Sequence, residues 1–149
     1  APVEQIRTIT ASILASGRAV WFGADCGQQS DRASGLFVEG LYDYDNLFGV
    51  DFSTSKEQRV NTGESAMNHA MLFTGVDIDE EGNARRFRVE NSWGEEPGEK
   101  GFFTMDAAWF DANVFEVAVH VDDLPADLRA VVTEEPLHLP AWDPMGALA

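Results

Sequence analysis

Two strand-like stretches on either side of a short acidic run constrain the fold of this chain more than any other feature. Residues 70–78 are almost continuously apolar, which is typical of a buried strand. The run at 79–83 has the composition of a turn. After it, apolar and polar residues alternate, and one face of the second strand carries Phe87, Val89, Asn91 and Trp93. The pattern predicts an antiparallel hairpin.

A turn centred near Glu81 also predicts the register of this hairpin, because paired positions then sum to about 162. His69 is expected to face Trp93, and Asn91 is expected to face Met71. His69 and Asn91 become diagonal neighbours, roughly 7–8 Å apart at the backbone and within side-chain reach of each other. A bulge in either strand would change this register.

An imidazole, an amide and an indole in contact are the side chains that a cysteine nucleophile needs around it. A cysteine attacks as the thiolate, which a neighbouring imidazolium stabilises. An amide oxygen that accepts from one ring nitrogen holds the imidazole in one tautomer without neutralising the ion pair. His69 and Asn91 are therefore candidate catalytic residues, and Trp93 is a candidate shield. The alternative is that His69 is a core histidine with satisfied hydrogen bonds.

Strings along nearly the whole chain carry a family resemblance. The two central ones are Asn-His-Ala-Met-Leu-Phe-Thr-Gly-Val at 68–76 and Val-Glu-Asn-Ser-Trp-Gly at 89–94. The chain ends in Pro-Ala-Trp-Asp-Pro-Met-Gly-Ala-Leu-Ala. Shorter strings of the same kind lie at 20–23, 41–43 and 63–65. Together they resemble the papain-like cysteine peptidases, and most closely the bleomycin hydrolase or aminopeptidase C branch.

This resemblance implies an activity and a role for each residue of the trio. In the family, the residues that match His69 and Asn91 are the catalytic base and its orienting partner, and the residue that matches Trp93 shields their contact. The implied reaction is removal of N-terminal residues from peptide substrates by a cysteine nucleophile, without a metal or a cofactor. A homo-oligomer is also implied, namely a ring-like homohexamer with active sites facing an inner cavity.

The end of the chain is expected to form an extended C-terminal arm. Residues 134–149 contain three prolines, which favour an extended conformation. In the family, this arm runs back into the cleft, so that the terminal carboxylate of Ala149 would bind the amino terminus of the substrate. The expected organisation is a catalytic-half domain at 1–133 followed by the arm at 134–149.

The family nucleophile has no counterpart in this sequence. It belongs to a Gln-x-x-x-Cys-Gly-x-Cys-Trp-like string at the start of a long helix, and no such string occurs here. The single cysteine, Cys26, is expected to be a small residue at a strand end rather than a nucleophile. The chain alone is therefore expected to be inactive, with the nucleophile in a missing N-terminal half of the same protein. The alternative is a non-catalytic binding or assembly domain on the same scaffold.

Composition narrows the possible partners. The net charge of −16, from 10 basic and 26 acidic residues, opposes binding to nucleic-acid phosphates or to an anionic membrane. A run of about 18 apolar residues, as a membrane span requires, does not occur. The start of the sequence shows no signal peptide. One cysteine cannot form an internal disulfide and fits a reducing cytosol, so a cytoplasmic location is expected.

Other patterns favour structural interpretations. Residues 77–82 imitate the start of a calcium loop, but Arg88 stands where the bidentate glutamate is needed. Ser65 lies in half of a nucleophile-elbow string and is expected to be a cap or loop hydroxyl. His120 is expected to be solvated, and His138 lies in the tail without ligand-type neighbours, so no metal site is predicted.

The remaining periodicities predict an α+β domain. Residues 24–40 have the composition of a loop. Helical patterns lie at 3–14, 42–50, 56–67, 106–113 and 125–132, and further strand patterns lie at 19–23, 101–105 and 115–121. The expected architecture is an antiparallel, barrel-like sheet with flanking helices and the extended arm. In the papain-like cysteine peptidases that the strings resemble, a domain of this kind is the half that supplies the base.

Overall fold

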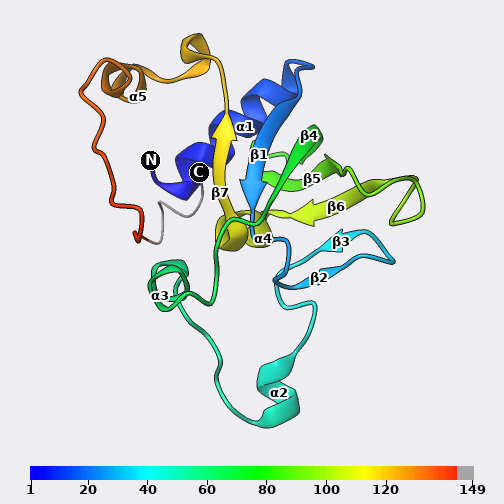
Figure 1. Cartoon of the computed structure of the whole chain (residues 1–149). Helices are drawn as coiled ribbons and strands as arrows, with labels where there is room; N and C mark the ends of the chain where they lie inside the picture. Colours follow the sequence, from blue (N-terminus) through cyan, green and yellow to red (C-terminus); the bar gives the residue numbers. More distant parts are fainter. Residues whose placement is uncertain (144–149) are drawn as a thin grey trace.

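Across residues 1–143, which the computed structural model describes, the chain forms one seven-stranded curled sheet (Figure 1). The strand order is β2-β3-β6-β5-β4-β1-β7, and all neighbours are antiparallel except β3 and β6. The predicted α+β fold is confirmed, with this one parallel pair as a departure from a purely antiparallel sheet. The strands are β1 (Val20–Ala24), β2 (Ser30–Asp31), β3 (Leu36–Phe37), β4 (His69–Ile78), β5 (Ala84–Glu90), β6 (Phe102–Asp106) and β7 (Val114–Ala118).

Helices flank the sheet on the described part of the chain, and none of them is long and apolar enough to cross a membrane. The longest, α1, contacts β4 and α4 through an apolar face that includes Ile9 and Ile13. Asp106 caps the start of α4, because its carboxylate accepts from the backbone N–H of Trp109. The helices are α1 (Val3–Ala15), α2 (Tyr44–Phe48), α3 (Lys56–Thr62), α4 (Ala107–Asn113), the 3-10 helix η1 (Val121–Asp123) and α5 (Ala126–Val131).

An aromatic core holds β4 and β5 against α4. The ring of Phe73 stacks on Phe22 at 3.7 Å and on Phe110 at 5.5 Å, and Phe110 also stacks on Phe87 at 5.0 Å. All four side chains are buried. Truncation of one such ring costs about 3–5 kcal/mol, so this core fixes the hairpin that carries the candidate site.

The predicted register of the hairpin is present at the end next to the site, where Leu72 pairs with Glu90 and Phe73 pairs with Val89. Two bulges interrupt the ladder, one after Phe73 and one after Asp77. One adds a residue to β4 and the other adds a residue to β5, so their effects on the register cancel.

The second strand is shorter than predicted. β5 ends at Glu90, so Asn91 and Trp93 lie in the loop after it and not in the strand. The backbone N–H of Asn91 donates to the carbonyl of Gly101 at 3.2 Å, which closes the loop. Gly101 has a φ of 85°, and a Cβ there would lie 2.7 Å from the carbonyl oxygen of Gly94. The loop thus requires glycine at this position.

Other boundaries also differ from the prediction. The expected loop at 24–40 contains β2 and β3, whose two-residue length is too short for a periodic signal. The helix expected at 56–67 ends at Thr62, because Gly63 adopts a left-handed conformation with φ 74°. The expected strand at 115–121 becomes β7 followed by η1.

The short helix α3 supports the end of α4. Lys56 Nζ donates to the carbonyls of Asp111, at 3.3 Å, and Val114. Arg59 Nη2 donates to the carbonyl of Ala112 at 2.8 Å. Two cations therefore satisfy carbonyls at the negative end of α4, which stabilises that helix.

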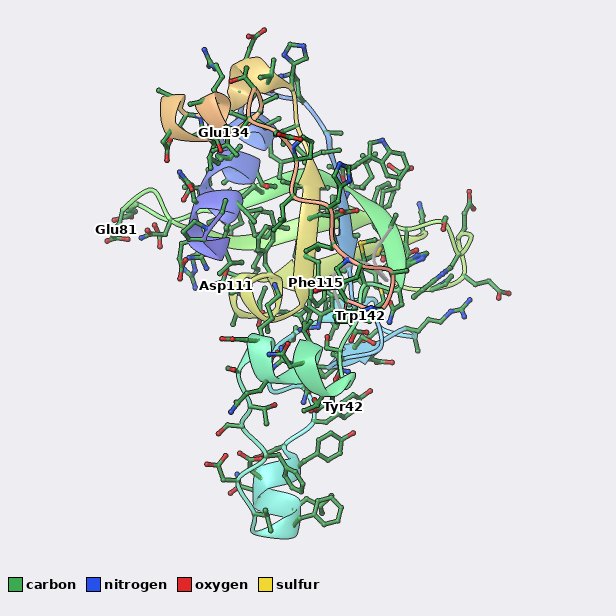
Figure 2. The ribbon with its side chains drawn as sticks, turned by 60° about the vertical axis from the view of Figure 1, so that its left-hand side comes forward. Tyr42, Glu81, Asp111, Phe115, Glu134 and Trp142 are labelled. Carbon is green, nitrogen blue, oxygen red and sulfur yellow. The ribbon has the colours of Figure 1, made fainter. Side chains whose placement is uncertain are left out.

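The segment after α5 is extended, as the prolines predict. It runs back from α5 in the direction of α3 (Figures 1 and 2). The side chains of Leu137 and Trp142 are 85% and 83% exposed, respectively. Residues 144–149 lie outside the described part of the chain, so the division at 133/134 stays a prediction.

Candidate active site

The pairing of β4 with β5 brings His69 and Asn91 to one edge of the sheet. His69 is the first residue of β4, and Asn91 directly follows β5. His69 Nε2 lies 2.9 Å from Asn91 Oδ1, and both side chains are half-buried. The predicted contact between these two side chains is present.

A neighbouring backbone group determines the tautomer of the imidazole. The N–H of Ser92 donates to Asn91 Oδ1 at 2.8 Å. An N–H cannot accept, so the atom that faces His69 is the amide oxygen. Because an amide oxygen only accepts, Nε2 of His69 carries the proton and donates. In the neutral ring Nδ1 then keeps its lone pair, and no residue of the described chain hydrogen-bonds to it. The ring presents one open basic nitrogen.

The indole of Trp93 covers one side of this pair. Its ring centre lies 5.0 Å from that of His69, and the two rings are nearly parallel at 19°. The indole also makes an edge-to-face contact with the buried ring of Phe103 at 5.7 Å. Nδ2 of Asn91 is buried and has no hydrogen-bond partner among residues 1–143. An unpartnered buried amide N–H costs stability, so stability alone does not select this arrangement.

A buried carboxylate holds the segment that leads into His69. Asp25 is 3% exposed and accepts hydrogen bonds from Asn68 Nδ2 at 2.6 Å and from Ser65 Oγ at 2.8 Å. Asn68 Oδ1 accepts from the backbone N–H of Cys26 at 2.9 Å. Asp25 is not among the candidate residues that the sequence patterns predict. The available signal was an aspartate directly after a strand whose neighbours are otherwise apolar.

Cys26 lies just beyond the end of β1, as predicted. It is 8% exposed, and its Sγ lies 3.9 Å from Met71 Sδ in the core. Burial raises the pKa of the Cys26 thiol to about 12, and the charge of Asp25 acts in the same direction. The thiol is therefore neutral and inaccessible, which is the opposite of what a nucleophile needs.

The isolated chain is accordingly expected to lack peptidase activity and to resist alkylation. A pKa of about 12 in place of 9.0 lowers the thiolate fraction about a thousandfold at mildly alkaline pH. Incubation with iodoacetamide, followed by mass spectrometry, should leave Cys26 unlabelled in the folded chain and label it rapidly in urea. Hydrolysis of aminoacyl fluorogenic substrates that disappears in Cys26→Ala would contradict this.

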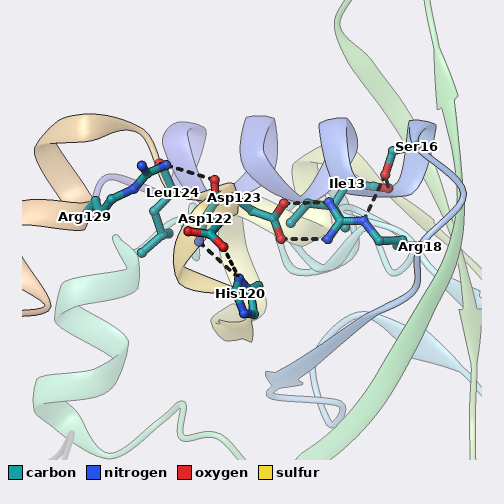
Figure 3. A network of polar contacts seen from close by, with 8 residues as sticks. All are labelled: Ile13, Ser16, Arg18, His120, Asp122, Asp123, Leu124 and Arg129. Atoms are coloured by element: carbon teal, nitrogen blue, oxygen red, sulfur yellow. Dashed lines mark hydrogen bonds and ion pairs between the residues drawn. The ribbon is translucent and has the colours of Figure 1, made fainter.

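The other sequence candidates lie apart from the trio. His120 has a 67% exposed side chain, and its Nδ1 lies 3.2 Å from an Asp122 oxygen, so it is solvated as predicted. It belongs to the polar network around η1, in which Arg18 forms a bidentate pair with Asp123 at 2.6 and 2.9 Å (Figure 3). His138 is exposed.

The remaining predictions concern metal ligands and the terminal carboxylate. Asp79 accepts from the backbone N–H of Asn83 at 2.7 Å and so closes the hairpin turn. Within the described residues, no cluster of three His, Cys, Asp or Glu side chains is placed to hold a metal ion. Ala149, the predicted contact of the substrate amino group, lies outside the described part of the chain.

Comparison with known proteins identifies the class that this fold and this trio define. The family model of the Peptidase C1-like family matches residues 1–146, and the chain belongs to this family of papain-like cysteine peptidases. Aminopeptidase C of Lactobacillus helveticus is 45% identical over 150 residues, and bleomycin hydrolase of Homo sapiens is 44% identical over 151 residues. Each alignment covers 99% of this chain and 33% of the relative.

A solved structure agrees with the fold. The crystal structure of PepW from Lactobacillus rhamnosis superimposes with a TM-score of 0.91 at 45% identity, over 97% of this chain and 33% of that one. The chain therefore spans about a third of the length of the relatives that it matches.

Proposed function

We propose that this chain is the part of a cysteine aminopeptidase that supplies the catalytic base. The observation that carries the proposal is the hydrogen bond from His69 Nε2 to Asn91 Oδ1, which leaves Nδ1 open. His69 is the proposed base, Asn91 the group that orients it, and Trp93 the shield. Relatives named aminopeptidase C and bleomycin hydrolase support this class of activity. The nucleophilic cysteine belongs to a part of the protein outside these residues.

In the proposed reaction, Nδ1 of His69 takes the proton of the cysteine thiol. The resulting thiolate adds to the scissile carbonyl of the peptide, and the imidazolium gives its proton to the departing amine. Water, deprotonated by Nδ1, then releases the acyl group from the cysteine. Throughout, Asn91 Oδ1 accepts from Nε2–H and keeps the ring from turning away. The reaction uses no metal and no cofactor.

The exposed apolar side chains favour a two-part protein over a binding domain that works alone. The α2 segment projects away from the sheet in both views (Figures 1 and 2). In α2 and just after it, four apolar side chains are more than half exposed: Leu47 (71%), Phe48 (63%), Val50 (54%) and Phe52 (53%). Contiguous apolar side chains of this kind mark contact surfaces. The remaining chain, or a second subunit, is proposed to cover them.

The finer features of the proposal rest on the resemblance of the sequence strings. The complete protein is proposed to be a cytoplasmic homohexamer that acts on peptide substrates. Its arm at 134–149 is proposed to end in the active-site cleft. The carboxylate of Ala149 is proposed to pair with the free amino group of the substrate, which restricts cleavage to N-terminal residues.

The complete protein should therefore cleave aminoacyl fluorogenic substrates and reject the same substrates with an acetylated amine. Deletion of residues 144–149 should raise turnover of the acetylated substrates about tenfold or more, because the group that excludes them is gone. Iodoacetamide should abolish both activities. If no substrate with a free amine is cleaved, the proposed function fails. If the shortened enzyme still requires a free amine, the proposed role of the arm is wrong.

A further inference from the structure

A cation without a polar partner lies next to the candidate site. Arg32 occupies the turn between β2 and β3, and its guanidinium carbon lies 4.9 Å from the ring centre of Trp93. The residue is exposed, and within residues 1–143 it forms no hydrogen bond or ion pair. Its five N–H donors are thus free. Hydrogen bonds to protein oxygens engage four of the other arginines, Arg7, Arg18, Arg59 and Arg129. The side chains of Arg85, Arg86 and Arg88, on β5, donate none within the described residues, so what distinguishes Arg32 is its place over Trp93.

The turn that carries Arg32 is firmly attached to the loop that carries Trp93. The carboxylate of Asp31 accepts from the backbone N–H of Ala33 at 3.1 Å and closes the turn. The carbonyl of Ala33 accepts from the N–H of Gly98 at 3.3 Å. The contact between the two segments is so close that a Cβ on Gly35 would lie 2.6 Å from the Cα of Gly98. The backbone that carries Arg32 is therefore held beside the loop that carries Trp93, and the side chain reaches the indole from there.

This position is within reach of a peptide bound at His69. The indole centre is 5.0 Å from the imidazole centre and 4.9 Å from the guanidinium carbon. The guanidinium consequently lies within about 10 Å of the imidazole, a span of about three residues of extended peptide. The net charge of −16 repels anionic groups in general, so a single cation at this place has a local effect on which peptides bind.

We propose that Arg32 is a specificity-determining residue that binds a carboxylate of the peptide substrate within about three residues of the scissile bond. The proposal rests on the proposed function. The carboxylate belongs either to the C-terminus of a short peptide or to an Asp or Glu side chain. A guanidinium binds either group with two parallel N–H···O bonds. The indole beneath it orients the fork and excludes water from one side.

The test uses the complete protein and two matched pairs of unblocked peptides. One pair is a tripeptide with a free C-terminal carboxylate and its amide. The other is an amidated tripeptide with Glu or Gln as its second residue. Arg32→Gln should raise KM about three- to tenfold for carboxylate-bearing peptides only, with kcat unchanged. Arg32→Lys, which keeps the charge, should restore part of the loss. The pair that responds identifies the source of the carboxylate.

Two results would overturn the proposal. Arg32→Gln could change KM equally for charged and neutral peptides, which would mean that the side chain acts only through Trp93. Alternatively, Arg32→Gln could leave KM unchanged for both charged and neutral peptides, which would mean that the guanidinium does not bind the substrate. If even the neutral amide is not cleaved by the unmodified protein, the proposed function fails. In that case, the same peptides are titrated into this chain, and the indole N–H resonance of Trp93 is monitored. This measurement tests whether Arg32 binds a peptide carboxylate. Carboxylate-dependent shifts that vanish in Arg32→Gln support it, and their absence refutes it.

Discussion

Replacement of His69 by alanine in the complete protein is expected to lower kcat by about three to four orders of magnitude, because the general base and acid of the reaction is lost. Asn91→Ala should lower kcat less, by about 10- to 100-fold, because this side chain orients the imidazole and transfers no proton. Steady-state hydrolysis of an aminoacyl fluorogenic substrate measures both. A His69→Ala enzyme within tenfold of the unmodified rate would contradict the assignment.

The matched control for this measurement is His120→Ala. His120 is also an imidazole with one polar neighbour, Asp122, but it belongs to the network around η1 and is exposed. Its replacement should leave kcat and KM unchanged. Equal losses in His69→Ala and His120→Ala would show that the effect comes from the fold and not from the site.

The second large effect is expected at Asp25. Asp25→Ala should lower the free energy of unfolding by about 2–4 kcal/mol, because it leaves the Ser65 hydroxyl and the Asn68 amide without their acceptor. Ser65→Ala, which removes one donor and leaves Asp25 its other partners, should cost only about 1 kcal/mol. Urea denaturation of this chain measures both changes. A loss below about 0.5 kcal/mol in Asp25→Ala would show that the carboxylate does not hold this segment.

The contact between His69 and Asn91 could be predicted from the sequence because it depends on local pairing. The turn at 79–83 and the alternation after it suffice to align β4 with β5. The two bulges leave that alignment intact because they cancel. The end of β5 at Glu90 could not be predicted, because it follows from the closure of the loop between Asn91 and Gly101. The amide still reaches the imidazole from the loop.

The surroundings of the trio could not be predicted, because they depend on segments that are distant in the sequence. β3 pairs in parallel with β6, and the turn with Arg32 packs on the loop near Gly98. The strands β2 and β3 have only two residues each, so neither has a periodic pattern from which this packing could be predicted. The same holds for Asp25, whose donors Ser65 and Asn68 lie some 40 positions further along the chain. Short strands and buried polar networks are specified by tertiary packing, which local patterns do not encode.

The imidazole resonances of this chain report whether Asn91 holds His69 as a base with an open Nδ1. A long-range proton–nitrogen correlation spectrum at neutral pH distinguishes the two neutral tautomers. The structure predicts a protonated Nε2 and an unprotonated Nδ1 for His69, and a loss of this preference in Asn91→Ala. A His69 ring with its proton on Nδ1, or one whose spectrum is the same in Asn91→Ala, would show that Asn91 does not hold the imidazole as a base with an open Nδ1.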